Sequence, residues 1–438
     1  MRFFESANSI LSGLILPVVL IGAGIYLAIR LKFFYIVHPV KTARAIASAG
    51  RGGGTSPFKA LTVALAGTLG VGNISGVATA IVAGGAGAVF WMWVSALAAM
   101  SVKYAEVYLA VRHRRSRETG HGREFYGGAY YYMKEGLAAP LGKRGAGLVA
   151  SLFACLLVSN SLLTGNVVQI NAAASVFDGV PKIAVGAVLA VAVAAVTVGG
   201  ARRVGDFTVR VIPFLTAVYC ALSLWVIAVN APRLGEVFGL IFREAFSFRA
   251  AAGGAAGFGI SRAVRFGVTR GVFSNEAGCG TAPTAHASAN VKGPHEQGCL
   301  GIFEVFCDTI LMCTMTALVI LLSGASGVDG IPLSMASYGA FFGKAGRIAI
   351  GVSVVIFALA TVICQEYYGI EALSSRGGGK RAKYVYLAAS FAATLAGSVM
   401  PQGSVWALAD FEIAAMTVIN TLAVFILSDE VVDKKRKR

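Results

Sequence analysis

The stretch RGVFSNEAGCGTAPTAH, residues 270–286, places a carboxylate, an amide and three glycines inside an almost entirely apolar part of the chain. Glycine weakens a helix, and an ionised carboxylate at the centre of a membrane helix costs several kcal/mol. Glu276 therefore needs a task or a partner, for which Arg270, six residues earlier, is a candidate. Alternatively, Glu276 only caps the backbone N–H groups of an interrupted helix. Both interpretations predict a broken helix here.

The whole chain has the composition of a membrane protein. Of its 438 residues, 56% are hydrophobic and 13% are charged, about half the charged share of an ordinary soluble domain. The net charge of +17 would suggest nucleic-acid binding if the basic side chains formed one face, but they lie in connections between apolar segments. We therefore expect a multi-pass plasma-membrane protein whose basic loops face membrane lipid, with no nucleic-acid partner.

Apolar segments long enough to cross a bilayer recur along the chain, and we predict an all-α protein of eleven membrane helices. The first segment, 10–29, is long for a signal peptide, lacks a cleavage site and ends in basic residues. The ten core helices are predicted at 58–82, 86–111, 146–177, 183–198, 207–229, 266–289, 299–322, 348–373, 385–399 and 405–427.

Basic clusters orient these helices. Five arginines lie between residues 112 and 123, and the C-terminal tail DKKRKR is strongly basic. Eleven spans place every such cluster on one side, so the N-terminus is expected outside and the C-terminus in the cytoplasm. The predicted regions are 1–57 (first helix and basic loop), 58–230 (first five-helix set), 231–265 (extracellular connection), 266–427 (second five-helix set) and 428–438 (tail).

The first helix of each five-helix set is interrupted at a matching position. The stretch GTLGVGNISG, residues 67–76, breaks the first, and SNEAGCG, residues 274–280, breaks the sixth. Paired broken helices are typical of inverted-repeat transporters, whose free backbone groups bind ligand at the bilayer midplane. The glycines alone would also fit close helix packing, as the Gly72 and Gly76 spacing shows, but packing does not explain the polar residues beside them.

Two long motifs carry a resemblance to a known family. The stretches GNISGVATAIVAGGAGAVFWMWVSALAAMSVKYAE and GVTRGVFSNEAGCGTAPTAHASA resemble the alanine or glycine:cation symporters, the sodium:alanine symporter family. Further resemblance at TGNVVQINA, FCDTILMCTMTAL, QEYYG and VWALADFE extends it over nearly the whole chain. The resemblance implies a leucine-transporter-type fold of two inverted five-helix repeats plus one extra helix, here N-terminal.

The resemblance also implies that a small amino acid binds beside the two breaks. The half-helix after the first break offers N–H groups and a positive dipole end to a carboxylate, while carbonyls at the second break suit an ammonium group. Family resemblance adds a glutamine of the third core helix. The predicted substrate residues are Gly70, Val71, Gly72, Asn73, Gln169, Phe273, Ser274 and Asn275.

Sodium is the coupling ion that the resemblance implies. By that resemblance, the carbonyls of Ala66 and Leu69 and the hydroxyl of Thr361 are nominated as its ligands. Asp308 and Thr309 are an alternative cation site, or a buried structural pair.

One departure from the family pattern affects specificity. The family often carries GWSYYG where this chain reads CQEYYG, so Gln365 replaces a tryptophan expected to line the pocket. If Gln365 points into the pocket, it favours a larger or more polar amino acid than alanine or glycine.

The sequence therefore predicts sodium-coupled symport of a small neutral amino acid: alanine, glycine, or a more polar one such as serine or glutamine. Proton coupling through Glu276, Glu366 or Asp308 is the main alternative. A membrane enzyme would need a nucleophile with its base and an orienting partner, and a channel would favour repeated filter segments. The sequence is compatible with a monomer and does not reveal the oligomeric state.

Overall fold

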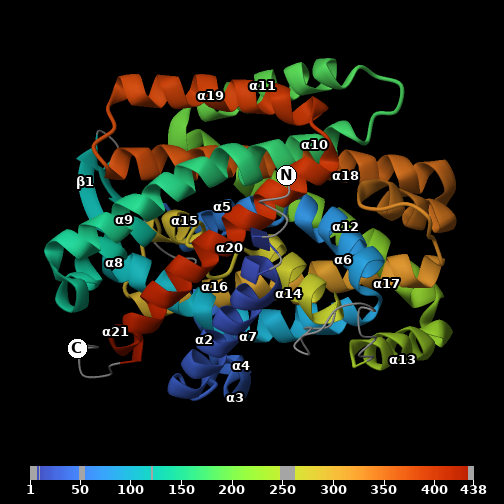
Figure 1. Ribbon diagram of the computed structural model, residues 1–438, viewed down its shortest axis with the longest axis horizontal. Helices are drawn as coiled ribbons and strands as arrows, with labels where there is room; N and C mark the ends of the chain where they lie inside the picture. Colours follow the sequence, from blue (N-terminus) through green and yellow to red (C-terminus); the bar gives the residue numbers. More distant parts are fainter. Residues whose placement is uncertain (1–6, 9, 49–54, 120–121, 247–261, 433–438) are drawn as a thin grey trace.

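The computed structural model describes residues 7–8, 10–48, 55–119, 122–246 and 262–432. The basic tail, residues 433–438, and residues 247–261 of the 231–265 connection fall outside these ranges. Helices dominate, and each predicted span coincides with helical structure (Figure 1).

The first half of the described chain contains these elements: η1 (Leu11–Ile15), α2 (Leu16–Arg30), α3 (Phe34–Val37), α4 (Pro39–Ser48), α5 (Pro57–Thr68), η2 (Val71–Asn73), α6 (Ser75–Gly84), α7 (Gly87–Arg112), β1 (Arg115–Thr119), β2 (Gly122–Tyr126), α8 (Ala129–Gly136), α9 (Ala138–Leu162), η3 (Leu163–Val168), α10 (Gln169–Ala174), α11 (Lys182–Thr197) and α12 (Gly200–Val229).

The second half contains η4 (Ala231–Arg233), α13 (Leu234–Ala245), α14 (Arg262–Asn275), α15 (Pro283–Ala287), α16 (Pro294–Val305), η5 (Phe306–Cys313), α17 (Thr314–Ser323), α18 (Ile331–Ser375), α19 (Lys380–Val399), α20 (Gln402–Ile426) and α21 (Ser428–Val432). The segments η1, η3 and η5 are π-helical, whereas η2 and η4 are 3₁₀-helical.

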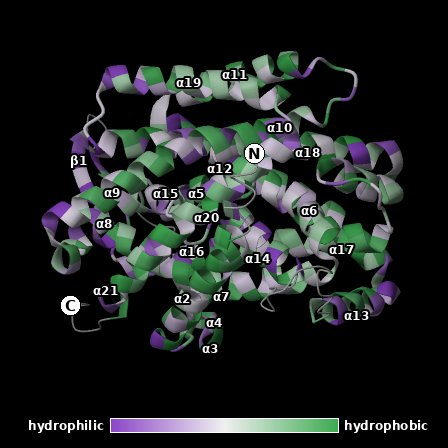
Figure 2. Cartoon of the chain, in the orientation of Figure 1, coloured by the Kyte–Doolittle hydropathy of each residue, from purple (hydrophilic) through white to green (hydrophobic). Residues whose placement is uncertain are grey.

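Among the described residues, seven helices are long and apolar enough to cross a membrane, or eight if the bent pair α5 and α6 is one span. Large apolar side chains are exposed on the outer helices, including Leu148 at 73% and Phe214 at 71%. Figure 2 shows hydrophilic residues gathered at helix ends and connections, for example around β1. This distribution fits a molecule surrounded by lipid. The predicted total of eleven crossings stays a prediction.

The expectation of an all-α chain is wrong in one place. The basic loop between α7 and α8 contains an antiparallel hairpin, in which Arg117 of β1 faces Glu124 of β2. Their side chains form an ion pair of 3.3 Å, and the guanidinium of Arg114 lies 3.9 Å from the Phe125 ring centroid. Cross-strand pairs of this kind stabilise short hairpins, and the concentration of arginine obscured the pattern.

The breaks lie within the packed interior. α14 packs against α7 and α6, and α18 contacts α9 and α5. α20 crosses the face shown in Figure 1, while α11 and α19 lie side by side at one edge. This arrangement brings α5, α10, α14 and α18, which carry the predicted site residues, into one bundle.

Candidate ligand site at two broken helices

The first break separates α5 from α6, whose axes differ in direction by 58°. The Val71 N–H lacks a helical partner and instead donates to Oε1 of Gln169 on α10, at 3.0 Å. Gly70 lies so close to this group that a Cβ there would come within 2.7 Å of Gln169 Oε1 and of Thr361 Oγ1. The structure thus brings together the backbone of the first break, Gln169 and Thr361, three parts of the predicted site.

The second break follows Asn275, the last residue of α14. Glu276 has φ +49°, and Gly278 and Gly280 have φ +80° and +74°. Only glycine adopts such angles without cost, so the Glu276 conformation is strained.

Three carbonyls at the end of α14 are free of backbone partners. Among the described residues, none donates a backbone N–H to the carbonyls of Phe273, Ser274 or Asn275. The Asn275 side chain caps the Ala277 N–H instead, at 2.9 Å. These carbonyls are therefore available acceptors, as the prediction for a substrate ammonium group requires.

The two breaks touch each other. A Cβ on Gly72 would lie 3.1 Å from the Ser274 Cα, so the two backbones are in direct contact. A polar chain through η5 also joins them. Asn73 Nδ2 donates to Asp308 Oδ1 at 2.7 Å, the Thr309 hydroxyl donates to Asp308 Oδ2 at 2.7 Å, and Asn275 Nδ2 donates to Thr309 Oγ1 at 3.0 Å. Asp308 and Thr309 thus connect Asn73 with Asn275.

The nominated sodium ligands include one close pair. The Thr361 hydroxyl of α18 donates to the Ala66 carbonyl of α5 at 2.9 Å, and both residues are buried. Leu69, the third nominated residue, is buried at the end of α5, where its N–H bonds to the Leu65 carbonyl. A carbonyl and a hydroxyl from two helices are oxygen ligands of the kind that a hard cation takes.

Glu276 spans the second break through side-chain contacts. Its Oε2 accepts from the Thr281 hydroxyl at 2.5 Å, and its Oε1 accepts from Gln365 Nε2 at 2.9 Å. The carboxylate therefore ties α14 to α18. Gln365 also packs against Gly165 of η3, where a Cβ would lie 2.5 Å from Gln365 Cγ.

The suggested pairing of Glu276 with Arg270 is wrong. Arg270 forms two hydrogen bonds of 2.6 and 3.1 Å with Asp410 of α20, and its guanidinium lies 4.3 Å from the centroid of the Trp406 ring. The helix turns Arg270 toward α20, whereas the positive φ of Glu276 turns its side chain toward α18.

Comparison of the sequence with known proteins identifies its family. The profile of the Sodium:alanine symporter family matches residues 1–437. The chain belongs to the sodium:alanine symporter family. It is 37% identical to the sodium/alanine symporter AgcS of Methanococcus maripaludis, over 99% of this chain and 96% of that protein.

The names of two Bacillus subtilis relatives give a different substrate or an additional ion from the name of AgcS. The probable sodium/glutamine symporter GlnT is 34% identical over 96% of this chain and 87% of its own length. The putative sodium/proton-dependent alanine carrier protein YrbD is 30% identical over 97% of this chain and 90% of its own length. Membership of this transporter family counts against the membrane-enzyme alternative, and it places this symporter-family protein in the plasma membrane as a multi-pass protein.

Sequence reasoning missed a group of buried charges under the second break of this symporter-family chain. The ammonium group of Lys103 lies 3.3 Å from Glu304 Oε1 and 3.6 Å from Glu106 Oε1, and it donates to the Glu276 carbonyl at 3.4 Å. His286 Nε2 lies 2.9 Å from Glu304 Oε2. Charged residues within the span 87–112 were a signal for this group, since such residues are rare in membrane helices and are usually functional.

Aromatic and charged side chains close the site on the α20 side. Phe273 packs against Trp406 with the two rings tilted by 52° and their centroids 4.7 Å apart, beside the pair of Arg270 and Asp410. On the side where α5 begins, Tyr368 is fully buried, and a Cβ on Gly67 would lie 2.9 Å from its hydroxyl oxygen. The two breaks are thus enclosed from both directions.

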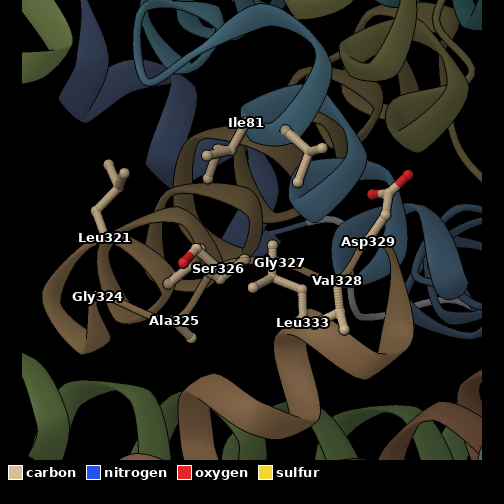
Figure 3. Close-up of a pocket in the computed structure, with 11 residues that line it drawn as sticks. Ile81, Leu321, Gly324, Ala325, Ser326, Gly327, Val328, Asp329 and Leu333 are labelled. Atoms are coloured by element: carbon tan, nitrogen blue, oxygen red, sulfur yellow. The ribbon is translucent and has the colours of Figure 1, made fainter.

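Two cavities, each of about 500 Å³, lie outside the predicted site. Figure 3 shows one of about 520 Å³, lined by Ile81 of α6, Leu321 of α17, Leu333 of α18 and the 324–329 loop. Another, of about 500 Å³, is lined by residues of α5, α12, α18 and the hairpin, including Val63 and Tyr367. Neither cavity is lined by any of the predicted substrate or sodium residues.

Proposed function

We propose that this protein is a sodium-coupled symporter of a small neutral amino acid that works by alternating access. The observation that carries the proposal is the contact between two broken helices. At the first break, the Val71 N–H donates to Gln169 instead of to a helical carbonyl, and the Ala66 carbonyl accepts from the Thr361 hydroxyl. The family membership and the names of its relatives support the same activity.

The carboxylate of the substrate would bind at the first break. Gln169 Oε1 occupies the position on the Val71 N–H that a carboxylate oxygen would take, so it stands in for the substrate. Binding would move the Gln169 side chain aside and place the carboxylate at the N-terminus of the second half-helix, beside Gly70, Gly72 and Asn73.

The ammonium group would bind across from it. The carbonyls of Phe273, Ser274 and Asn275 are acceptors at the C-terminal end of α14, where the helix dipole is negative. Because Gly72 abuts Ser274, one small amino acid would bridge the two breaks. A bulky side chain would force them apart, which favours substrates near alanine in size.

Sodium would link substrate binding to α18. It would bind between the Ala66 carbonyl and the Thr361 oxygen after the hydroxyl hydrogen turns away, with Leu69 as a further carbonyl ligand. Because Ala66 and Leu69 lie on the same half-helix as the carboxylate site, the ion and the substrate stabilise the same local backbone.

Two closures would provide the alternating gates. In the predicted orientation, the pair of Arg270 and Asp410 with Phe273 and Trp406 closes the extracellular path. The Tyr368 hydroxyl, beside Gly67, donates to the Val63 carbonyl at 3.4 Å, and Val63 lines the cavity that would be the cytoplasmic exit. Tyr368 would thus be the cytoplasmic gate.

Gln365 is the residue that we expect to modify specificity. It binds Glu276 and packs on Gly165, so it reaches the second break from α18. Its carboxamide would allow a substrate more polar than alanine, such as serine or glutamine.

Transport into proteoliposomes tests the proposal. An inward sodium gradient is expected to drive alanine uptake, with unlabelled glycine, serine and glutamine as competitors. Uptake driven by a proton gradient alone would instead support proton coupling, for which the buried carboxylates of Glu276 and Asp308 are the candidates.

A matched pair of variants tests the sodium site. Thr361→Val removes the hydroxyl that donates to the Ala66 carbonyl of α5. Ser353→Ala removes a hydroxyl whose one hydrogen bond among the described residues stays within α18, to the Ala349 carbonyl at 2.8 Å. Thr361→Val is expected to raise the half-saturating sodium concentration at least tenfold, about 1.4 kcal/mol, and Ser353→Ala to leave it unchanged. Equal half-saturating sodium concentrations in the two variants would show that Thr361 is not a sodium ligand.

A further inference from the structure

Five ionisable residues form a closed group below the second break, which we call the buried charge cluster: Lys103, Glu106, Glu276, His286 and Glu304. Glu276 is 6% exposed, and the other four side chains have no exposure at all. They come from α7, α15, α16 and the break itself, so the cluster joins three helices to the irregular segment.

The cluster has an excess of negative charge. The cluster holds three carboxylates but a single ammonium group: Lys103 pairs with Glu106 and Glu304, while the Glu276 carboxylate bonds to Thr281 and Gln365. His286 adds a positive charge only when it is protonated. An uncompensated charge in a buried site costs several kcal/mol, and a group in this position binds a proton in preference to bearing that cost. The ammonium group of Lys103 lies beside oxygens of Glu106, Glu304 and Glu276, so it occupies the place that a bound metal cation would take.

His286 is positioned to receive a proton. Its Nε2 faces Glu304 Oε2 at 2.9 Å, and its Nδ1 faces the Gln297 side-chain amide at 2.7 Å. With Gln297 donating through Nε2, Nδ1 is an acceptor, and Gln297 Oε1 is buried with no hydrogen-bond partner in the part of the chain that the structure describes. A half-turn of the amide would present Oε1 to a protonated Nδ1, so the same pocket accommodates the imidazolium.

Glu106 provides the second acceptor. Its Oε2 accepts from Asn420 Nδ2 at 2.8 Å and from the Gly280 N–H at 3.3 Å. Its Oε1 is buried and, among the described residues, has no hydrogen-bond partner, with Lys103 at 3.6 Å. A proton there would satisfy this atom and reduce the excess charge.

The cluster, together with Asn420, which donates to Glu106, holds the backbone of the break directly. Lys103 donates to the Glu276 carbonyl, Glu106 accepts from the Gly280 N–H, and Asn420 donates to the Gly278 carbonyl at 2.8 Å. A change of charge in the cluster therefore changes the contacts of residues 276–280, which follow the carbonyls assigned to the substrate.

We propose that the buried charge cluster is a proton-binding site, with His286 and Glu106 as its acceptors, and that its occupancy is coupled to substrate binding at the second break. The coupling to substrate binding rests on the proposed transport function, whereas the proton-binding site itself does not depend on it. By linkage, substrate binding takes up or releases protons whenever the cluster changes its proton affinity.

The other titratable groups near the cluster are the carboxyl group of Asp308, four residues after Glu304, and several thiols and phenols. The thiols and phenols ordinarily titrate well above neutral pH, so they do not account for proton exchange near pH 7. They are Cys279, Cys364, Tyr132 and Tyr368.

Calorimetry of the purified full-length protein tests the coupling. L-alanine is titrated in sodium chloride at about pH 7 in two buffers that differ in ionisation enthalpy, and the difference in heat gives the protons exchanged per alanine. Wild type is expected to exchange protons, and His286→Gln and Glu304→Gln each to reduce the number by at least half. His113→Gln, a titratable residue outside the cluster, is the matched control and is expected to match wild type.

Thermal unfolding tests the site without any substrate. In the His113→Gln background, stability is expected to fall as the pH rises from about 6 to 8, because the folded cluster holds protons that the unfolded chain releases. His286→Gln or Glu304→Gln in that background is expected to flatten this slope. Unchanged slopes and equal proton numbers in all variants would overturn the proposal. Absence of alanine heat with a slope that depends on His286 would contradict the proposed substrate and retain the proton site.

Discussion

At the scale of single residues, Gly72 controls how closely the two broken helices approach. Its neighbour is the backbone of Ser274, which lacks the freedom of a side-chain end to move away. A Cβ here would lie 3.1 Å from the Ser274 Cα, so one of the two backbones would have to shift by a few tenths of an ångström. In the sequence, the spacing of Gly72 and Gly76 is also compatible with close helix packing. The structure shows that the close contact of Gly72 is with Ser274 of the other broken helix.

Gly72→Ala should therefore weaken substrate binding while leaving most of the protein folded. The added methyl group separates the carboxylate and ammonium sites by a few tenths of an ångström, and we expect at least a tenfold loss of alanine affinity, about 1.4 kcal/mol. Gly22→Ala in α2 is the control, since outside the backbone of its own helix no atom of the described residues lies within 4 Å of its Cβ position. Radioligand binding measures both variants, and equal affinities would show that the two breaks do not share one ligand.

Gln365 offers a second test at this scale. Gln365→Leu keeps the bulk against Gly165 but leaves Glu276 Oε1 without its donor. Loss of one partner of a buried acceptor costs about 1–3 kcal/mol, so a lower melting temperature is expected. Competition assays should also show a weaker preference for serine and glutamine over alanine. An unchanged competition profile would exclude Gln365 from specificity.

At the scale of elements, the pair of Arg270 and Asp410 joins α14 to α20. Arg270 has a side chain 4% exposed, so Asp410→Asn would leave a buried cation without its counter-ion, at a cost of about 3 kcal/mol. Replacing both partners with apolar residues, as in Arg270→Met with Asp410→Leu, should restore much of the stability. If the pair is a gate, the double variant remains inactive in uptake. Recovered uptake would make the pair purely structural.

A second element-scale contact joins α7, α8 and α21. His113, just after α7, lies 3.2 Å from Glu135 Oε2 and 3.1 Å from Glu430 Oε2. Burial lowers the pKa of His113, but hydrogen bonds to Glu430 and Glu135 outweigh this effect and raise the pKa above its ordinary 6.5. The charged pair therefore stabilises the fold fully below about pH 6.5, and this stability is lost as the pH rises through the raised pKa.

Thermal unfolding across this pH range measures the His113 contribution. Wild type is expected to lose more stability between about pH 6 and 8 than His113→Gln does. Identical pH dependence would mean that Glu135 and Glu430 do not stabilise the imidazolium.

At the scale of the whole molecule, local sequence signals predicted the broken helices better than the contacts between them. Clustered glycines beside Asn73 and Glu276 mark the interruptions, because close helix packing would explain the glycines but not the polar residues beside them. The sequence could not show that Glu276 turns away from Arg270, since that depends on a single positive φ value. Nor could it show that Lys103, Glu304 and His286 meet, because residues so distant in sequence are joined only by tertiary packing.

The number of membrane crossings is the remaining whole-molecule prediction, and residues 202 and 326 test it. Length and hydropathy alone identify two crossings between them, Gly200–Val229 and Pro294–Ser323, which would place both residues on one side. The sequence prediction adds a third, because the broken helix formed by α14 and α15 must also cross if it is to bind substrate at the midplane. Three crossings place the exposed residues Arg202 and Ser326 on opposite sides.

Cysteine labelling of intact cells distinguishes the two counts. In a background that lacks the exposed Cys155, a membrane-impermeant maleimide is expected to modify Ser326→Cys from outside and Arg202→Cys only in inverted vesicles. A membrane-permeant maleimide should modify both and so controls for reactivity. Modification of both cysteines from the same side would mean that α14 and α15 return to the surface from which they entered. The two breaks could then not face each other across a single substrate during alternating access.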